Sequence, residues 1–266
     1  MSTRRPEMAS PIISLQGVSK VFANQIAVRN LTFSVEPGEV VGLLGQTGAG
    51  KSTALGLILG QIEPSSGTIV VDGCDPFREF AALRGKVAVS FQSDRLIPWR
   101  TARENVELGL EILRRPKSER RASAKEWLER VKLGPQHHEK YPHQMSGGMR
   151  QRVSLARALV IDPDLVLLDE SFSQLDHVTS KTLRLDFLAL VKQLRKTCVF
   201  ITHRIEDALE MANRIFVMAA PGEIKLELRL TDAQRSDPAF IAETAARIAG
   251  AMTQTTTETQ RDPAAA

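Results

Sequence analysis

The sequence has 266 residues, of which 42% are hydrophobic and 25% charged, and its formal net charge is +4. These values are typical of one globular domain, with or without an inserted lobe, and they argue against a disordered or fibrous chain. The small basic excess does not by itself indicate a nucleic-acid-binding protein.

The chain contains no apolar run of the roughly 18 residues that a membrane-spanning helix needs, and residues 1–10 lack an apolar signal core. We therefore expect a cytoplasmic protein. Its two cysteines, Cys74 and Cys198, lie in unrelated contexts and are predicted to be free thiols. Residues 1–10 and 251–266 are predicted to be flexible ends, which leaves residues 11–250 as the folded domain.

Two kinds of strand pattern occur along the chain. Alternating apolar residues around Phe33 and Val71 predict half-exposed antiparallel strands. Short continuous apolar runs are typical of parallel strands that are buried on both faces, and together they indicate an α/β fold. These runs occupy residues 40–44, 86–91, 165–168 and 198–201.

Residues 93–160 show a helical pattern instead. Thr101 and Glu104 have the spacing of a capping box, in which two side chains satisfy free amides at the start of a helix. An apolar stripe with helical spacing follows, formed by Ala124, Trp127, Leu128 and Val131. The sequence thus predicts an inserted α-helical subdomain.

Residues 45–52 match the pattern G-x-x-x-x-G-K-[ST], with an apolar strand before them and a helix predicted over residues 53–59. Glycines let backbone amides turn toward phosphate oxygens, and the helix N-terminus favours negative charge. Lys51 is expected to neutralise the outer phosphates, and Ser52 to offer a hydroxyl to Mg²⁺. The predicted ATP-binding residues of this loop are Gly45, Gln46, Thr47, Gly48, Ala49, Gly50, Lys51, Ser52 and Thr53.

This loop alone leaves kinases, GTPases and transport ATPases open. The chain has no Asn-Lys-x-Asp guanine-reading motif, which favours ATP over GTP. Downstream, an apolar run ends in Asp169 and Glu170, which are suited to Mg²⁺ and to the attacking water respectively. A second motif begins at Ser146, which is expected to cap the helix that follows, and continues with two glycines.

With these motifs in the same order, the sequence resembles the ATPases of ABC transporters from Ile12 to about Leu230. Residues 145–151 resemble the family's signature, Gln92 occupies the place of its glutamine loop, and His203 follows a strand as the switch histidine does. The resemblance implies a P-loop NTPase (RecA-like) core with an antiparallel β subdomain and an inserted α-helical subdomain.

The resemblance also implies roles for individual residues. Glu170 is expected to be the catalytic base, His203 to contact the γ-phosphate and Gln92 to contact Mg²⁺ and water. Phe22 occupies the position of the aromatic residue that stacks on adenine, although packing in the core is an alternative for this side chain. The implied metal ligands are Ser52, Gln92 and Asp169.

In this family two chains share each nucleotide, so the resemblance implies a head-to-tail dimer with two composite sites. A single chain is then expected to be nearly inactive. Asp176 is placed in the dimer loop. The residues expected to contact ATP held by the opposing subunit are Ser146, Gly147, Gly148 and Gln151.

Four positions depart from the family pattern and put the hydrolysis rate in doubt. Met145 replaces a leucine, Ser171 a proline, Gln174 an alanine and Arg204 an acidic residue. None of them removes a chemical group assigned above, but Arg204 places a cation beside His203, where it is expected to disfavour the imidazolium form.

The run Leu96-Ile97-Pro98-Trp99 resembles importers of the nitrate, sulfonate, taurine and bicarbonate group. Trp99 is then expected either to contact the permease or to pack against the first helix of the inserted subdomain. The resemblance predicts an ATP-hydrolysing importer subunit at the cytoplasmic face of the membrane, with a second ATPase copy, a permease and, indirectly, a periplasmic or extracellular solute-binding protein as partners, and no nucleic acid. The alternative is a soluble ABC ATPase that acts on nucleic acid or ribosomes.

Overall fold

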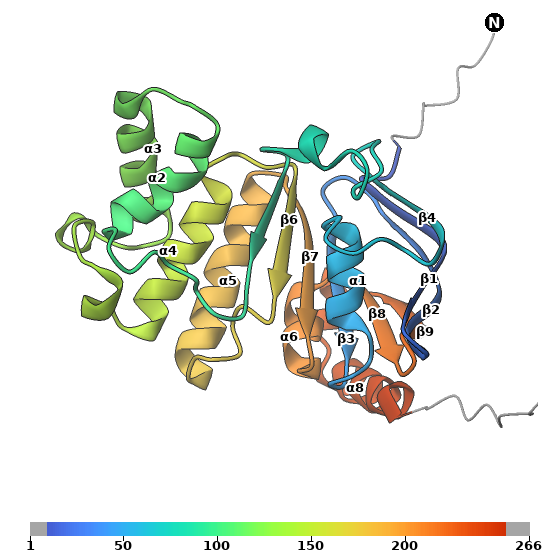
Figure 1. The fold of residues 1–266 in the computed structure, drawn as a ribbon. Helices are drawn as coiled ribbons and strands as arrows, with labels where there is room; N and C mark the ends of the chain where they lie inside the picture. The colour runs from blue at the N-terminus through green and yellow to red at the C-terminus, as the bar shows by residue number, and fades with distance from the viewer. Residues whose placement is uncertain (1–9, 254–266) are drawn as a thin grey trace, which may run out of the picture.

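The computed structural model describes residues 10–253, which form two β-sheets and the helices around them (Figure 1). The larger sheet has six strands in the order β5-β6-β7-β3-β8-β9, of which only β9 runs antiparallel to its neighbour. The bounds are β3 (Val40–Gly45), β5 (Val87–Ser90), β6 (Leu165–Asp169), β7 (Thr197–Thr202), β8 (Arg214–Ala219) and β9 (Glu223–Arg229). The four predicted parallel strands are therefore β3, β5, β6 and β7, and they lie side by side.

The alternating segments form a separate antiparallel sheet in the order β2-β1-β4. Its strands are β1 (Ile13–Phe22), β2 (Gln25–Val35) and β4 (Ser66–Val71). The two strand types thus segregate as the sequence predicts. Strands β1, β8 and β9 were not among the predicted elements, although β1 pairs with β2 and β8 with β9, its neighbour in the chain.

Apolar residues of the larger sheet alternate between two cores, which explains why its strands are apolar at nearly every position. On β3, Val41 and Leu43 pack with α1 (Lys51–Ile58) and the smaller sheet, whereas Val40 and Leu44 face the opposite core. That second core contains α4 (Gly147–Leu159), α5 (His177–Gln193), α6 (Ile205–Met211) and α8 (Pro238–Thr253). Helix α1 thus lies between the two sheets.

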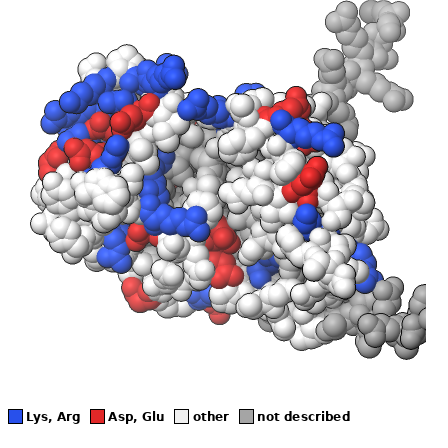
Figure 2. All heavy atoms as spheres, viewed as in Figure 1, with Lys and Arg blue, Asp and Glu red and all other residues white. Residues whose placement is uncertain are grey.

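The predicted inserted subdomain is built from α2 (Ala102–Ile112) and α3 (Lys117–Arg130), which pack against each other and against α4. The capping box of Thr101 and Glu104 is present at the start of α2. Lys and Arg side chains gather over this subdomain (Figure 2), and several of them lie in the turn between α2 and α3 and at the start of α3. These are Arg114, Arg115, Lys117, Arg120 and Arg121.

Three short 3₁₀ helices and one short α-helix complete the described chain: η1 (Phe80–Leu83), η2 (Pro135–His137), η3 (Pro142–Gln144) and α7 (Asp232–Arg235). Among residues 10–253, no helix has the length and apolar character needed to cross a bilayer.

The C-terminal boundary differs from the predicted one. Helix α8 continues to Thr253, and Ala251 is buried, because the apolar spacing of Thr244, Ile248 and Ala251 extends the core-facing stripe by one turn. The rest of the predicted C-terminal tail, and residues 1–9, lie outside the described residues.

Candidate nucleotide-binding site

The candidate site lies at one edge of the larger sheet. Because β3, β5, β6 and β7 are parallel, the segments that follow them meet at the same edge. These segments are the glycine-rich loop after β3, Gln92 after β5, Glu170 after β6 and His203 after β7. The topology therefore collects residues that are up to 158 positions apart in the sequence, as the separation of Gly45 and His203 (203 − 45) shows.

The backbone conformation of the glycine-rich loop requires glycine at two positions. Gly48 and Gly50 have φ angles of 86° and 84°, in the left-handed region that other residues rarely adopt. A Cβ atom on Gly50 would lie 2.6 Å from the carbonyl oxygen of Ala27. The loop passes directly into α1, which begins at Lys51, two residues before the predicted start.

Lys51 is buried, and its ammonium group donates hydrogen bonds to the carbonyl oxygens of Gly45 (2.8 Å) and Gln46 (2.9 Å). Burial lowers the pKa of Lys51, while Glu170 and Asp169 act in the opposite direction. The loop thus bends back over its own lysine. This arrangement holds a cation beside the amides at the start of α1, where phosphate oxygens are favoured.

Asp169 is half-buried at the end of β6, and its environment is unfavourable for a lone carboxylate. Burial is the main cause that raises the pKa of Asp169, and the neighbouring Glu170 raises it further. Only part of this effect is offset by Arg95 and Lys51. A divalent cation at this position would relieve the repulsion, so the donor set of Asp169 and the exposed Ser52 fits Mg²⁺.

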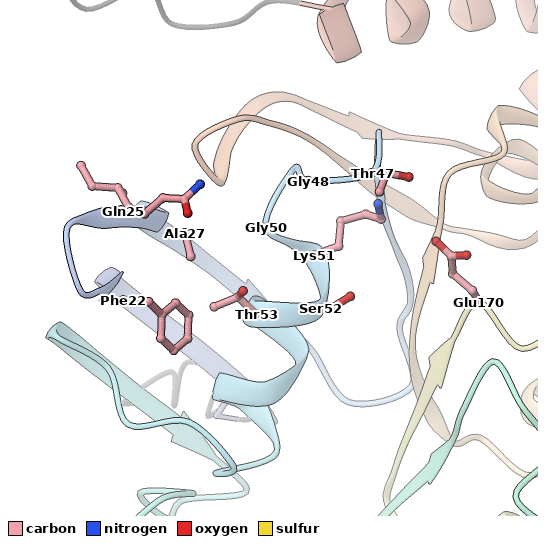
Figure 3. A pocket seen from close by; sticks show the side chains of 11 residues that line it. Phe22, Gln25, Ala27, Thr47, Gly48, Gly50, Lys51, Ser52, Thr53 and Glu170 are labelled. Atoms are coloured by element: carbon pink, nitrogen blue, oxygen red, sulfur yellow. The ribbon is translucent and has the colours of Figure 1, made fainter.

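An open cavity of about 320 Å³ extends along the glycine-rich loop. Phe22 lies at one end of it and the carboxylate of Glu170 at the other, facing the ammonium group of Lys51 (Figure 3). The cavity is lined by Phe22, Gln25, Ile26, Ala27, Thr47, Gly48, Gly50, Lys51, Ser52, Thr53 and Glu170. Phosphate-binding groups and an aromatic ring thus share one elongated space.

Phe22 is 46% exposed, so it is not a core residue of this fold. The ammonium group of Lys20 lies 5.0 Å from the centroid of its ring. Three further lining residues, Gln25, Ile26 and Ala27, were not predicted. They follow Phe22 across the tight β1–β2 connection, which is the one sequence signal that places them near the site.

Glu170 adopts a strained backbone conformation with φ of 45°. Its side chain lies close to His203, with 3.2 Å between Oε1 of Glu170 and Nδ1 of His203. Two groups of Ser173 bind the carbonyl oxygen of Glu170, the amide at 3.0 Å and the hydroxyl at 2.8 Å. The predicted base and the predicted γ-phosphate contact are thus adjacent.

Gln92 is exposed and is not among the residues that line the cavity. Its side-chain amide is 3.5 Å from the hydroxyl of Ser173, which places it beside the turn that follows Glu170. The structure therefore brings Gln92 to the turn that follows Glu170.

The signature residues form a second surface, separate from the cavity. Ser146 caps α4 and accepts a hydrogen bond from the amide of Met149 at 3.3 Å, as predicted. Gly148 packs closely against the start of α5, since a Cβ atom there would lie 2.9 Å from Cγ2 of Thr179. Asp176 caps α5 through the amide of Thr179 at 3.0 Å, and this bond lowers the pKa of Asp176. Ser146 and Asp176 are both exposed on this surface.

Gln151 does not belong to that surface. It is only 4% exposed, and its amide points inward to the hydroxyl of Ser90 at 3.5 Å. Gln151 lies on the buried side of α4, and its contact with a nucleotide on another subunit stays a prediction.

Arg204, which the sequence places next to His203 as an added cation, is accompanied by two carboxylates. Its guanidinium group lies 3.6 Å from Glu206 and 3.8 Å from Asp207. These carboxylates compensate its charge beside His203. Of the other departures from the family pattern, Met145 is buried and Gln174 is exposed.

Trp99 is 76% exposed, so it does not pack against the first helix of the inserted subdomain. The loop that carries it is held by Asn105, a fully buried residue that sequence reasoning missed. Its side-chain oxygen accepts from the amide of Ile97 (2.7 Å), and its side-chain nitrogen approaches the carbonyl oxygens of Ile97 (3.1 Å), Arg100 (3.0 Å) and Thr101 (3.0 Å). The tryptophan is thus presented on a fixed loop.

A family model described as "ABC transporter" matches residues 28–173, which include the glycine-rich loop, the signature and Glu170. The chain belongs to the ABC transporter family. The predicted resemblance and the predicted fold class are both confirmed, since solved ABC cassettes share the fold.

The reported relatives are transport proteins. The taurine import ATP-binding protein TauB of Yersinia pestis bv. Antiqua (strain Antiqua) is 37% identical over 244 residues, which cover 87% of this chain and 93% of that protein. The choline transport ATP-binding protein OpuBA of Bacillus subtilis (strain 168) is 37% identical over 215 residues, covering 80% of this chain. This chain spans only 56% of the length of OpuBA.

Two solved structures show the same fold. The ATP-binding cassette MJ0796, in a dimeric post-hydrolysis state bound to ADP and Pi, aligns with a TM-score of 0.73 and 32% identity, over 82% of this chain and 99% of that one. The protein cbiO1 from Clostridium perfringens, part of the complex cbiONQ, aligns with a TM-score of 0.76 and 23% identity, over 90% of this chain and 99% of that one. The second likeness supports the fold alone.

Proposed function

We propose that this chain is the ATP-hydrolysing subunit of an importer and acts as a dimer with two shared nucleotide sites. The observation that carries this proposal is the separation, on one chain, of the glycine-rich loop from the exposed surface around Ser146. The cavity from Phe22 to Glu170 lies along the glycine-rich loop, whereas Ser146 caps α4 on an exposed surface that does not line it. A second copy is needed to bring the two surfaces together, and MJ0796 was solved as a dimer.

Within one site, each residue has a chemical task. Phe22 stacks on the adenine, and Lys51 with the amides at the start of α1 neutralises the phosphates. Glu170 takes the proton of the attacking water, and the neighbouring His203 contacts the γ-phosphate. Mg²⁺, held by Ser52, Asp169 and Gln92, would supply charge neutralisation on the phosphate oxygens when bound.

The partner chain would complete the site with the exposed surface around α4. Ser146 and the amides of Gly147 and Gly148 supply further donors for the γ-phosphate, and Asp176 lies at the same interface. Loss of the γ-phosphate after hydrolysis removes the group that both chains bind. The dimer then opens, which converts the energy of hydrolysis into motion.

The permease would bind on the side of the fold that carries Trp99. Trp99 is 76% exposed there, on a loop whose backbone is held by Asn105. Among transported solutes, the nitrate, sulfonate, taurine and bicarbonate group is favoured, because TauB is matched over nearly its whole length. The subunit would then work at the cytoplasmic face of the membrane, and the solute-binding protein would act on it indirectly.

The shared site is tested by Ser146→Arg, which places a bulky cation on the signature surface. ATP binding to the single chain should remain normal, whereas ATP-dependent dimerisation, measured by light scattering, and phosphate release should both be lost. Ser118→Arg, at an exposed serine of α3, is the matched control. Full phosphate release by Ser146→Arg would contradict a shared site.

The transport role is tested by co-purification from solubilised membranes. We expect a membrane protein to accompany the chain, and a solute of the favoured group to stimulate phosphate release by the complex. Recovery of ribosomes or DNA in place of a membrane protein would instead support the nucleic-acid alternative.

A further inference from the structure

Three functional segments of this chain are joined by buried hydroxyl groups. Ser171, the residue after Glu170, is 3% exposed and donates a hydrogen bond of 2.8 Å to the carbonyl oxygen of Ser90. Ser90 is the last residue of β5, two positions before Gln92. Its own hydroxyl lies 3.3 Å from that of Ser154 on α4, the helix that begins at the signature.

A second link lies parallel to the first. The side-chain amide of Gln92 lies 3.5 Å from the hydroxyl of Ser173, which itself donates to the carbonyl oxygen of Glu170. Two hydrogen bonds therefore join the end of β5 to the turn after β6: a buried one from Ser171 to Ser90 and an exposed one from Gln92 to Ser173. The buried link is the shorter, and it is shielded from water, which would otherwise compete for its partners.

The turn needs such an anchor because Glu170 is strained. A non-glycine residue with φ of 45° persists only where its surroundings hold it in place. The amide of Glu170 donates to the carbonyl oxygen of Ile201 at 3.1 Å, which fixes the turn to β7. Ser171 supplies the corresponding attachment on the other side, to β5. The family pattern has a proline at the position of Ser171, and a proline has no hydroxyl to make this bond.

We propose that Ser171 is a positioning residue for Glu170. Through its hydroxyl, it fastens the strained turn to the strand end that carries Gln92, so that the carboxylate of Glu170 is held in line with the attacking water. This role rests on the proposed function, in which Glu170 is the catalytic base. Ser171, which departs from the family pattern, would thus assist catalysis through Glu170 without contacting the nucleotide.

The test compares Ser171→Ala, which removes the hydroxyl, with Ser171→Thr, which retains it. In steady-state phosphate release by the full chain, kcat of Ser171→Ala should fall about three- to tenfold, which corresponds to one buried hydrogen bond lost from the transition state. The KM for ATP and the affinity for ATP should stay unchanged, and Ser171→Thr should retain most of kcat. A merely structural role would not separate kcat from KM in this way.

Thr197→Val is the matched control for lost stability. Thr197 is also buried, and its hydroxyl accepts from the amide of Gly38 at 3.0 Å, at the end of β7 away from His203. This variant should lose stability but retain kcat. An unchanged kcat in Ser171→Ala, an equal loss of kcat in Ser171→Thr, or an equal loss in Thr197→Val would overturn the proposal. Absence of ATP hydrolysis by the wild-type chain would instead overturn the proposed function itself.

Discussion

Nδ1 of His203 lies 3.2 Å from Oε1 of Glu170, although the two residues follow different strands. The contact exists because β6 and β7 are parallel neighbours that end at the same edge of the sheet. Each side chain limits the positions open to the other. In the proposed mechanism, the pair sets the place where a water molecule and the γ-phosphate would meet.

Replacing Glu170 by Gln should separate binding from hydrolysis. The amide has almost the same shape as the carboxylate but cannot take a proton, so kcat should fall about a hundredfold or more. ATP affinity should stay within about twofold of the wild-type value, because the phosphates are held mainly by Lys51 and the loop amides. Equilibrium binding and phosphate release measured on the same preparation check this. Near-normal phosphate release would exclude Glu170 as the base.

Asp169→Asn should stabilise the nucleotide-free and metal-free chain at neutral pH. In the folded chain, burial and Glu170 raise the pKa of Asp169 above its ordinary value of 3.8, which holds in the unfolded chain. At a pH between 3.8 and the raised pKa, the folded chain therefore binds more protons than the unfolded chain. Stability therefore falls as the pH rises through this window, and the full cost is present above it. The Asn variant avoids this cost.

Urea unfolding in the presence of EDTA measures this effect. The stability difference between Asp169→Asn and the wild-type chain should be largest at pH 7 and vanish as the pH falls below about 3.8. The same variant should bind Mg²⁺ with nucleotide about 10- to 100-fold more weakly. A wild-type chain more stable than the variant at pH 7 would show that Asp169 is not destabilised by its surroundings.

Phe22→Ala should weaken ATP binding without slowing hydrolysis. Stacking of a base on an aromatic side chain contributes about 1–3 kcal/mol, so the KM for ATP should rise about tenfold while kcat at saturating ATP is retained. Phe22→Trp should restore the affinity. Phe80→Ala, at an exposed ring outside the cavity, is the control and should leave KM unchanged.

Trp99→Ala should leave phosphate release by the isolated chain unchanged but reduce recovery of the permease complex. An exposed aromatic residue at the centre of an interface typically contributes about 2 kcal/mol or more, so complex stability should fall at least about tenfold. Leu185→Ala removes an apolar side chain that is 45% exposed elsewhere and serves as the control. Equal recovery of the complex with both variants would exclude Trp99 from the interface.

Asn105→Ala should destabilise the fold, since it leaves the amide of Ile97 and three carbonyl oxygens without their side-chain partner. The loss expected from such unpaired groups is about 1–3 kcal/mol in the free energy of unfolding. Urea unfolding measures it, and protease cleavage near Trp99 should increase. An equally stable variant would mean that the loop is held by other contacts.

The sequence allowed much of the fold to be predicted because its two strand types leave different patterns. Continuous apolar runs identified four of the parallel strands, and the family resemblance implied that the glycine-rich loop, Glu170 and His203 serve one site. Strand β8 was missed although it is equally apolar. Local pattern does not show the partners of a strand, which for β8 are β3 on one side and the following strand β9 on the other.

The direction of single side chains was harder to predict. Gln151 belongs to the signature by its place in the sequence, yet it shares the spacing of the buried residues Ser154, Leu155 and Ala158 on α4, a helical signal that motif matching overlooked. Trp99 is exposed on a loop whose backbone is held by hydrogen bonds from Asn105, and no sequence pattern specifies these bonds. Ser171 likewise looked like a loss of proline until its partner on β5 was known.

The loop of Trp99 has a consequence for how subunits recognise each other. A loop that is already fixed by Asn105 loses little conformational entropy when a partner binds it, so its shape acts as a template and not as an adaptable contact. A permease that binds there, as proposed, would have to fit this loop as it stands. To make a related ATPase bind the same permease, the short segment around Trp99 would have to be transferred together with Asn105. Neither the segment nor the asparagine would suffice alone.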